Sequence, residues 1–351
     1  MAQGIGLHST VGDERRSFAQ KQIRRRAWHG CLMLDQAAST MLGRLATHSQ
    51  SQSVPLPEAV DDCYLCPDMA ICEQPPGILS RVEWVYCYVE VASAAAENEQ
   101  EMTHSIEQAQ ILIQIDLDLE SFRTSIPKPI DWESRADGQP DLLLREKCLL
   151  KARFLYLRLL AYRPVLSQSL NHMRDAQTKS DEDTRKIPET GIYSSIVMNC
   201  SVQCVQSAIE LITLINETCS TELASVWFYN VFYTFSAGLS IIIAEHHRQV
   251  LRLVIRESLN LAWDKCHSTL DYLKSIDMLA ERCAHTLNGT RARCSKVQSG
   301  FSSWVHNGPQ TYTSSTIKAV AGEQGDENGS EDIFADIGFD NIDWSLFDFD
   351  Y

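Results

Sequence analysis

The segment from Trp227 to Ala244 restricts the fold more than any other part of the chain, because its eighteen residues carry no charge. A helix of this length could cross a membrane. Polar residues interrupt the segment, however, and no flanking basic cluster or aromatic belt sets an orientation in a bilayer. We therefore interpret it as a helix buried on all sides at the centre of a helical domain. The interrupting residues are Asn230, Thr234, Ser236 and Ser240.

Apolar residues at helical spacing predict further helices before this segment. One contains Trp28, and Gly43 is expected to end it. Helices are also expected between Ile78 and Phe122, with a strong helix former at Ala92 to Ala96, and from Asp141 until Arg163-Pro164 kinks or ends the helix. The apolar stripe of the first helix comprises Ile23, Ala27, Cys31, Leu34 and Ala38.

After a polar stretch at residues 171–190, which is expected to be a loop, the same spacing continues. Met198 to Ile212 forms one stripe, and Leu251 to Leu287 predicts one long helix or a pair, ended by Asn288-Gly289. The fold class is therefore all-α, a multi-helix domain with a disordered C-terminal tail. Its predicted parts are a helical domain at 1–288, a disordered linker at 289–330 and an acidic-aromatic segment at 331–351.

The net charge of −15 is concentrated at the C-terminus. Residues 322–351 contain ten acids and no Lys or Arg, which leaves only −5 on the remaining residues. Because the net charge of residues 1–321 is close to zero, this part of the chain does not by itself attract nucleic acid. Twelve cysteines, without an apolar leader at the N-terminus, favour an intracellular reducing compartment in which cysteines serve as small buried hydrophobes.

Aromatic residues alternate with the acids of the last twenty residues. The acids keep such a segment solvated, while the aromatic rings stay available to a groove on a partner. This pattern is typical of an activation segment that folds on binding, and a purely solubilising tail is the alternative. The candidate partner-binding residues are Phe334, Phe339, Trp344, Phe347 and Phe349.

Two charged groups near the N-terminus have alternative interpretations. Arg24, Arg25 and Arg26 are consistent with a phosphate-binding patch or a nuclear signal, although a solvated helix face is the default expectation. Asp61 and Asp62 could act as an acid/base pair. Adjacent side chains of an extended chain point in opposite directions, so capping or loop anchoring is favoured.

Cys63, Cys66 and Cys72 form half of a metal-binding spacing. No matching second half follows, and the residues between these cysteines are neutral or acidic. We therefore expect no metal here, and stoichiometric zinc in the purified chain would overturn this view. No motif of a hydrolase, metalloprotease or nucleotide-binding loop is present, so no enzyme is expected and no cofactor is assigned to these residues.

The N-terminal residues resemble the later half of the fungal-specific transcription factor domain, the middle homology region of binuclear zinc-cluster regulators. The resemblance is looser after Asp62 and covers roughly residues 1–290. His29 departs from the family pattern, which has a second aromatic after Trp28. The residues that carry the resemblance include Arg24, Arg25, Arg26, Trp28, Asp35, Gly43, Arg44, Pro57, Asp61 and Asp62.

The resemblance implies a nuclear, all-α regulatory domain that controls RNA polymerase II transcription, followed by an activation tail. The six-cysteine zinc cluster and the front of the domain would precede Met1, so we expect an N-terminally truncated chain. DNA would be bound only through that domain or through a partner chain. Transcriptional coactivators, a small-molecule effector and a dimer partner are further expectations; no membrane is expected. The alternative is a non-DNA-binding protein that pairs with or titrates a full-length relative or coactivator.

Overall fold

The structure is a computed structural model that describes residues 2–41, 54–67, 69, 71–78, 80, 82, 106–134, 141–178 and 191–306. Within these ranges all regular structure is helical, which confirms the all-α prediction. Several segments with predictions lie outside the described part, among them the expected helix at Ala92–Ala96, the end of the expected loop at 179–190, and residues 307–351. The α-helices are α1 (Phe18–Met41), α3 (Ile106–Ser125), α4 (Asp141–Thr178), α5 (Ile192–Thr218), α6 (Trp227–His246), α7 (Arg256–Leu273) and α8 (Met278–His306), and the 3-10 helices are η1 (Asp13–Arg15), η2 (Asp62–Tyr64) and η3 (Val250–Arg252).

Helix α6 is the central element of the bundle, and it packs against α4, α5, α7 and α8. Every residue from Asn230 to Ala244 is buried. Both α5 and α6 are long and apolar enough to cross a membrane by length and composition, but 83% of the apolar stretch of α6 is buried within the protein. This burial is that of a core helix, as the sequence predicted.

Helix α6 packs closely against α7 and α8 at Gly238. A Cβ atom built at this glycine would lie 2.9 Å from Leu287 Cδ1 of α8 and 3.2 Å from Cys266 Sγ of α7. All three residues face the core, and Cys266 and Leu287 are fully buried. A side chain at this position would therefore need Leu287 to move, so glycine favours close packing of the three helices.

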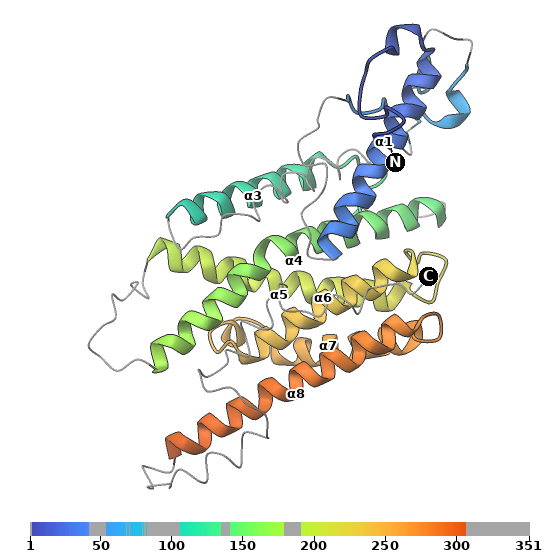
Figure 1. Ribbon diagram of the computed structural model, residues 1–351. Helices are drawn as coiled ribbons and strands as arrows, with labels where there is room; N and C mark the ends of the chain where they lie inside the picture. Colours follow the sequence, from blue (N-terminus) through green and yellow to red (C-terminus); the bar gives the residue numbers. More distant parts are fainter. Residues whose placement is uncertain are drawn as a thin grey trace.

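Helix α4 continues through Pro164, so the proline does not end the helix. Proline lacks the N–H that would bond to the preceding turn, and Figure 1 shows the helix changing direction part-way along its length. Tyr162, Val165 and Leu166, which flank the proline, are buried and hold both halves in the core. The predicted loop at 171–190 is wrong in its first part, because α4 extends to Thr178.

The predicted helix between Leu251 and Leu287 is a pair, α7 and α8, but its predicted end is wrong. Helix α8 runs through Asn288-Gly289 to His306, so residues 289–306 of the predicted linker are helical. Tertiary contacts override the local Asn-Gly signal: Thr290 and Cys294 are buried, and Arg291 binds Glu245 of α6. The described cysteines of α5, α7 and α8 are free thiols, as expected for small buried hydrophobes.

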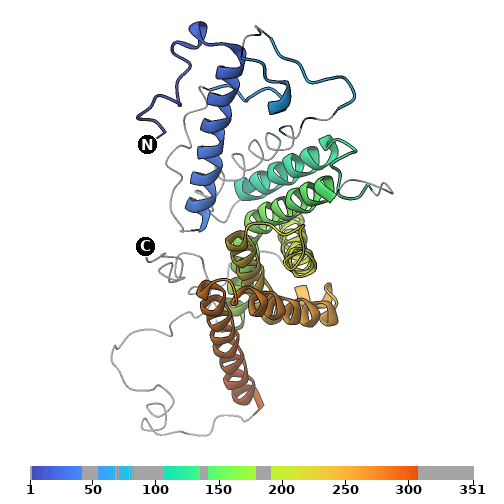
Figure 2. The ribbon, with the colours of Figure 1, turned by 90° about the vertical axis from the view of Figure 1, so that its right-hand side faces the viewer.

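Helix α1 lies at one end of the molecule, beyond α3 and α4 (Figures 1 and 2). Its predicted apolar stripe is wrong, because Ile23 and Leu34 are 60% and 62% exposed. The helix instead buries Ala19, Gln22, Trp28 and His29. Trp28 is fully buried but lies outside the core cluster of the bundle, so α1 has a small core of its own.

Candidate functional site

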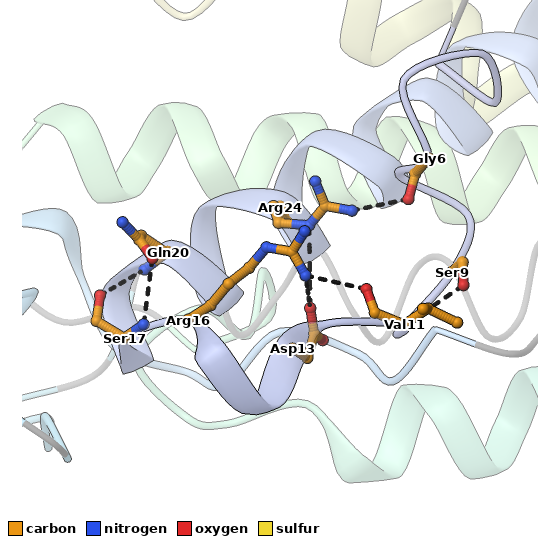
Figure 3. Close-up of polar contacts among 8 residues, drawn as sticks. All are labelled: Gly6, Ser9, Val11, Asp13, Arg16, Ser17, Gln20 and Arg24. Atoms are coloured by element: carbon orange, nitrogen blue, oxygen red, sulfur yellow. Dashed lines mark hydrogen bonds and ion pairs between the residues drawn. The ribbon is translucent and has the colours of Figure 1, made fainter.

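Each of the three consecutive arginines of α1 contacts an acidic side chain of a neighbouring segment. Arg24 Nη2 donates to the Gly6 carbonyl at 2.7 Å, and its Nε lies 4.0 Å from Asp13. Arg16 binds the same Asp13 carboxylate at 2.9 Å, as Figure 3 shows. These contacts fix the N-terminal turn against α1.

The other two arginines hold the extended arm at residues 54–62. Arg25 Nη1 lies 3.8 Å from Glu58, and Arg26 donates to both the Asp62 carboxylate and the Val60 carbonyl. The arginine side chains are only 19–24% exposed. The expectation of a solvated helix face is therefore wrong, and because these guanidinium groups already contact protein acceptors they do not form a free phosphate-binding patch.

Polar residues of α1 complete the attachment of the arm. Gln22 Nε2 donates to Glu58 Oε1 at 3.2 Å, and the Glu58 amide donates back to Gln22 Oε1 at 2.7 Å. His29 Nε2 lies 3.2 Å from the Pro55 carbonyl, which can only accept a proton, so this nitrogen donates. Burial lowers the pKa of His29, which keeps the ring neutral. His29 thus acts as a hydrogen-bond donor that helps to attach the arm to α1.

Asp61 and Asp62 contact different partners, although only Asp61 has an extended backbone and Asp62 is the first residue of η2. The Asp61 carboxylate accepts from Ser80 Oγ at 3.0 Å and from Gln74 Nε2 at 3.2 Å, while Asp62 pairs with Arg26. Asp61 makes no side-chain capping bond to η2. Loop anchoring is therefore the role that the geometry shows, and the two carboxylates are not arranged as an acid/base pair.

The three cysteines that follow do not converge on one point. Cys72 is buried and its sulfur accepts from the Cys66 amide at 3.3 Å, whereas Cys63 and Cys66 are exposed. Among the described residues, no group of three His, Cys, Asp or Glu side chains is placed to hold a metal ion.

The remaining predicted residues are placed as follows. Pro57 is buried in the arm, and Asp35 lies half-buried on α1. Gly43 and Arg44 lie outside the described residues, as do the tail residues Phe334, Phe339, Trp344, Phe347 and Phe349. Of the predicted site residues, the structure pairs Arg26 with Asp62, while Arg24 and Arg25 bind other partners.

Sequence reasoning missed a part-buried Ser–His contact between α4 and the segment after α6. His247 Nε2 lies 2.8 Å from Ser169 Oγ, and the Val250 amide donates to His247 Nδ1 at 3.3 Å. Because Nδ1 is an acceptor, the proton of the neutral ring is on Nε2, which donates to Ser169. A catalytic serine would need the opposite arrangement, with the histidine accepting its proton. Burial also lowers the pKa of His247, so the contact is a structural link between helices.

A cavity of about 450 Å³ opens where the end of α6 meets η3, the start of α7 and the middle of α8. Glu245, Arg256 and Arg291 supply its charged groups. These residues come from three separate helices, and the predicted break at Gly289 would have placed Arg291 in a linker. No spacing rule in the sequence could have found this cavity.

The N-terminal residues are similar to a known protein family. The model of the fungal specific transcription factor domain matches residues 1–63. The matched region contains both α1 and the arm that its arginines hold, so the ion pairs described above lie within the matched residues. The search of solved structures found no significant match.

Two curated relatives extend the similarity beyond the matched segment. The chain is 21% identical over 284 residues to "Sorbicillinoid biosynthetic cluster transcription factor 2" of Penicillium rubens, covering 79% of this chain and 39% of that protein. It is 22% identical over 257 residues to "Transcription factor FBD3" of Gibberella moniliformis, covering 68% of this chain and 33% of the relative. The chain thus spans well under half the length of either relative.

Proposed function

We propose that this chain is the regulatory part of a fungal transcription regulator that acts in the nucleus on RNA polymerase II transcription. One observation carries the proposal: the match to the transcription factor domain in residues 1–63 continues as similarity to two transcription factors over most of the chain. The protein-bound, partly buried arginines and the neutral Ser–His link support a scaffold role, because they leave neither a phosphate patch nor a nucleophile in these segments.

In this proposal the helical domain supports the acidic-aromatic segment 331–351, which recruits coactivators through its aromatic side chains. DNA is reached through a zinc-cluster domain outside these residues or on a partner chain, since the described arginines of α1 are occupied by protein groups. Zinc would belong to that cluster. The chemistry of the proposed role is recognition, with no reaction catalysed by this chain.

A tethering experiment tests the activation part. The whole chain is fused to an unrelated DNA-binding domain, and transcription of a reporter carrying its site is measured. The fusion should raise reporter expression several-fold, and Trp344→Ala with Phe347→Ala should abolish most of the increase. A matched variant with Ser314→Ala and Ser315→Ala, in the predicted linker, serves as the control.

The same assay separates activation from titration. A fusion that leaves the reporter unchanged, together with an untethered chain that represses a reporter driven by a full-length relative, would support the titration alternative. Equal activity of the wild type and the tryptophan–phenylalanine variant would contradict the assignment of the tail aromatics.

A further inference from the structure

The cavity between α6, α7 and α8 has a lining suited to an organic anion. Arg256 and Arg291 face the charge of a single glutamate, Glu245, which leaves the charged lining with a net charge of +1. Asn260 and Asn288 add side-chain amides, which can both donate and accept hydrogen bonds. A volume of about 450 Å³ lies in the usual range of small-molecule sites and is far larger than a bare phosphate ion needs.

One side of the cavity is rigid. Arg291 Nε and Nη2 bind the two Glu245 oxygens at 2.9 and 2.5 Å, and the guanidinium plane lies over the Trp263 ring at 4.2 Å. A bidentate pair that also stacks on an aromatic ring holds an arginine in one orientation. Arg291 is therefore positioned before any ligand arrives, which lowers the entropic cost of binding.

The other charged side of the cavity is available to a ligand. Arg256 is the first residue of α7 and is exposed. Within the described segments it makes no ion pair or side-chain hydrogen bond with protein, unlike Arg291. Leu251 and Leu259 add apolar surface to the same cavity. An oxyanion could bind Arg256 while an organic group covers the leucines.

We propose that this cavity binds a small organic acid whose carboxylate or phosphate group is held by Arg256, with Arg291 and the two asparagines orienting the rest of the molecule. This inference rests on the proposed function: binding of a metabolite at the site would regulate the transcription regulator. Asn288 and Arg291 lie on α8, the helix that precedes the activation-like segment in the chain. Occupancy of the cavity would thereby act on the described helix that is closest in sequence to that segment.

Ligand-observed NMR titration of the purified full chain tests the proposal with four probes: benzoate, citrate, inorganic phosphate and uncharged benzamide. Saturable binding of benzoate or citrate is expected, with benzamide at least tenfold weaker than benzoate. Arg256→Gln should weaken binding of the organic acid at least tenfold. Arg252→Gln removes a nearby exposed arginine that does not line the cavity, and it should bind as the wild type does.

Three results would overturn the inference. They are the absence of saturable binding by all the anionic probes, equal binding by the Arg256→Gln variant, and binding of inorganic phosphate as tight as that of the organic acids. The thermal unfolding midpoint of each variant is measured in parallel, and an unchanged midpoint shows that Arg256→Gln acts on binding. Because these measurements are made without DNA or a reporter, their failure is distinct from failure of the proposed role in transcription.

Discussion

Arg26 of α1 binds Asp62, thirty-six residues further along the chain, and also donates to the Val60 carbonyl. The two partners are in different environments: the Asp62 side chain is 88% exposed, whereas Val60 is buried. An exposed ion pair is screened by water and contributes little, while a buried carbonyl without its donor is costly. The carbonyl contact is therefore the important part of this attachment.

Substitution of either partner of this ion pair should separate the two contributions. Asp62→Ala should reduce the free energy of local unfolding of the arm by less than about 1 kcal/mol. Arg26→Ala should reduce it by about 1–3 kcal/mol, because Val60 loses its side-chain donor. Hydrogen exchange of the amides in residues 56–65 measures both effects. Equal losses in the two variants would show that the ion pair itself holds the arm.

Trp28 should be essential to the small N-terminal core. Trp28→Ala should destabilise this segment by about 3–5 kcal/mol, because a fully buried aromatic ring leaves a cavity. Leu34→Gln, on the exposed face of the same helix, should change stability by less than about 0.5 kcal/mol. Circular dichroism and hydrogen exchange of α1 test the pair. A larger effect at Leu34 would restore the apolar stripe inferred from spacing.

Two glycines in helices should respond to alanine with opposite signs. Gly238→Ala places a methyl group 2.9 Å from Leu287 Cδ1 and should destabilise the protein by about 1–2 kcal/mol, after the gain in helix propensity. Gly289→Ala meets no atom within 4 Å and should stabilise it by about 0.5–1 kcal/mol. Urea unfolding compares the two. A destabilising Gly289→Ala would contradict the continuation of α8 through this residue.

Stability should fall as the pH decreases below 6.5, the ordinary pKa of histidine. Burial lowers the pKa of His247, and the pKa values of His29 and His267 shift in the same direction. Below pH 6.5 the unfolded chain therefore binds more protons at these histidines than the folded chain does. The stabilisation that comes from keeping the histidines neutral is complete above pH 6.5 and is lost as the pH falls below it. Urea unfolding at pH 7.5 and 5.0 measures the decrease.

A variant of His247 should show how much of this loss of stability at low pH comes from His247. In His247→Asn the side-chain oxygen can still accept from Val250, so the variant should be less stable at pH 7.5 but less sensitive to acid. His285→Asn, on the exposed face of α8, is the matched control. An undiminished pH dependence in His247→Asn would show that the buried ring does not contribute.

The sequence predicted the parts of this fold that depend on hydrophobic pattern alone. The uncharged stretch of α6 is buried, as its hydrophobic pattern predicted. Asp61 and Asp62 do have different partners, as expected, but Asp62 begins η2, so the extended backbone that the prediction assumed holds only for Asp61. The pattern misassigned α1, because its partner is a polar arm that buries Gln22 and His29 rather than Ile23 and Leu34. It also ended α8 too early, since the contacts of Arg291 with Glu245 and Trp263 are distant in sequence.

The role in transcription is tested most directly by removing the protein from the cells that make it. A degron fused to the chain is triggered, and nascent RNA polymerase II transcripts are measured within minutes, before indirect effects accumulate. Transcription of a limited set of genes should change several-fold and return when the wild-type chain is restored. Unchanged nascent transcription across the genome after complete depletion would contradict the account.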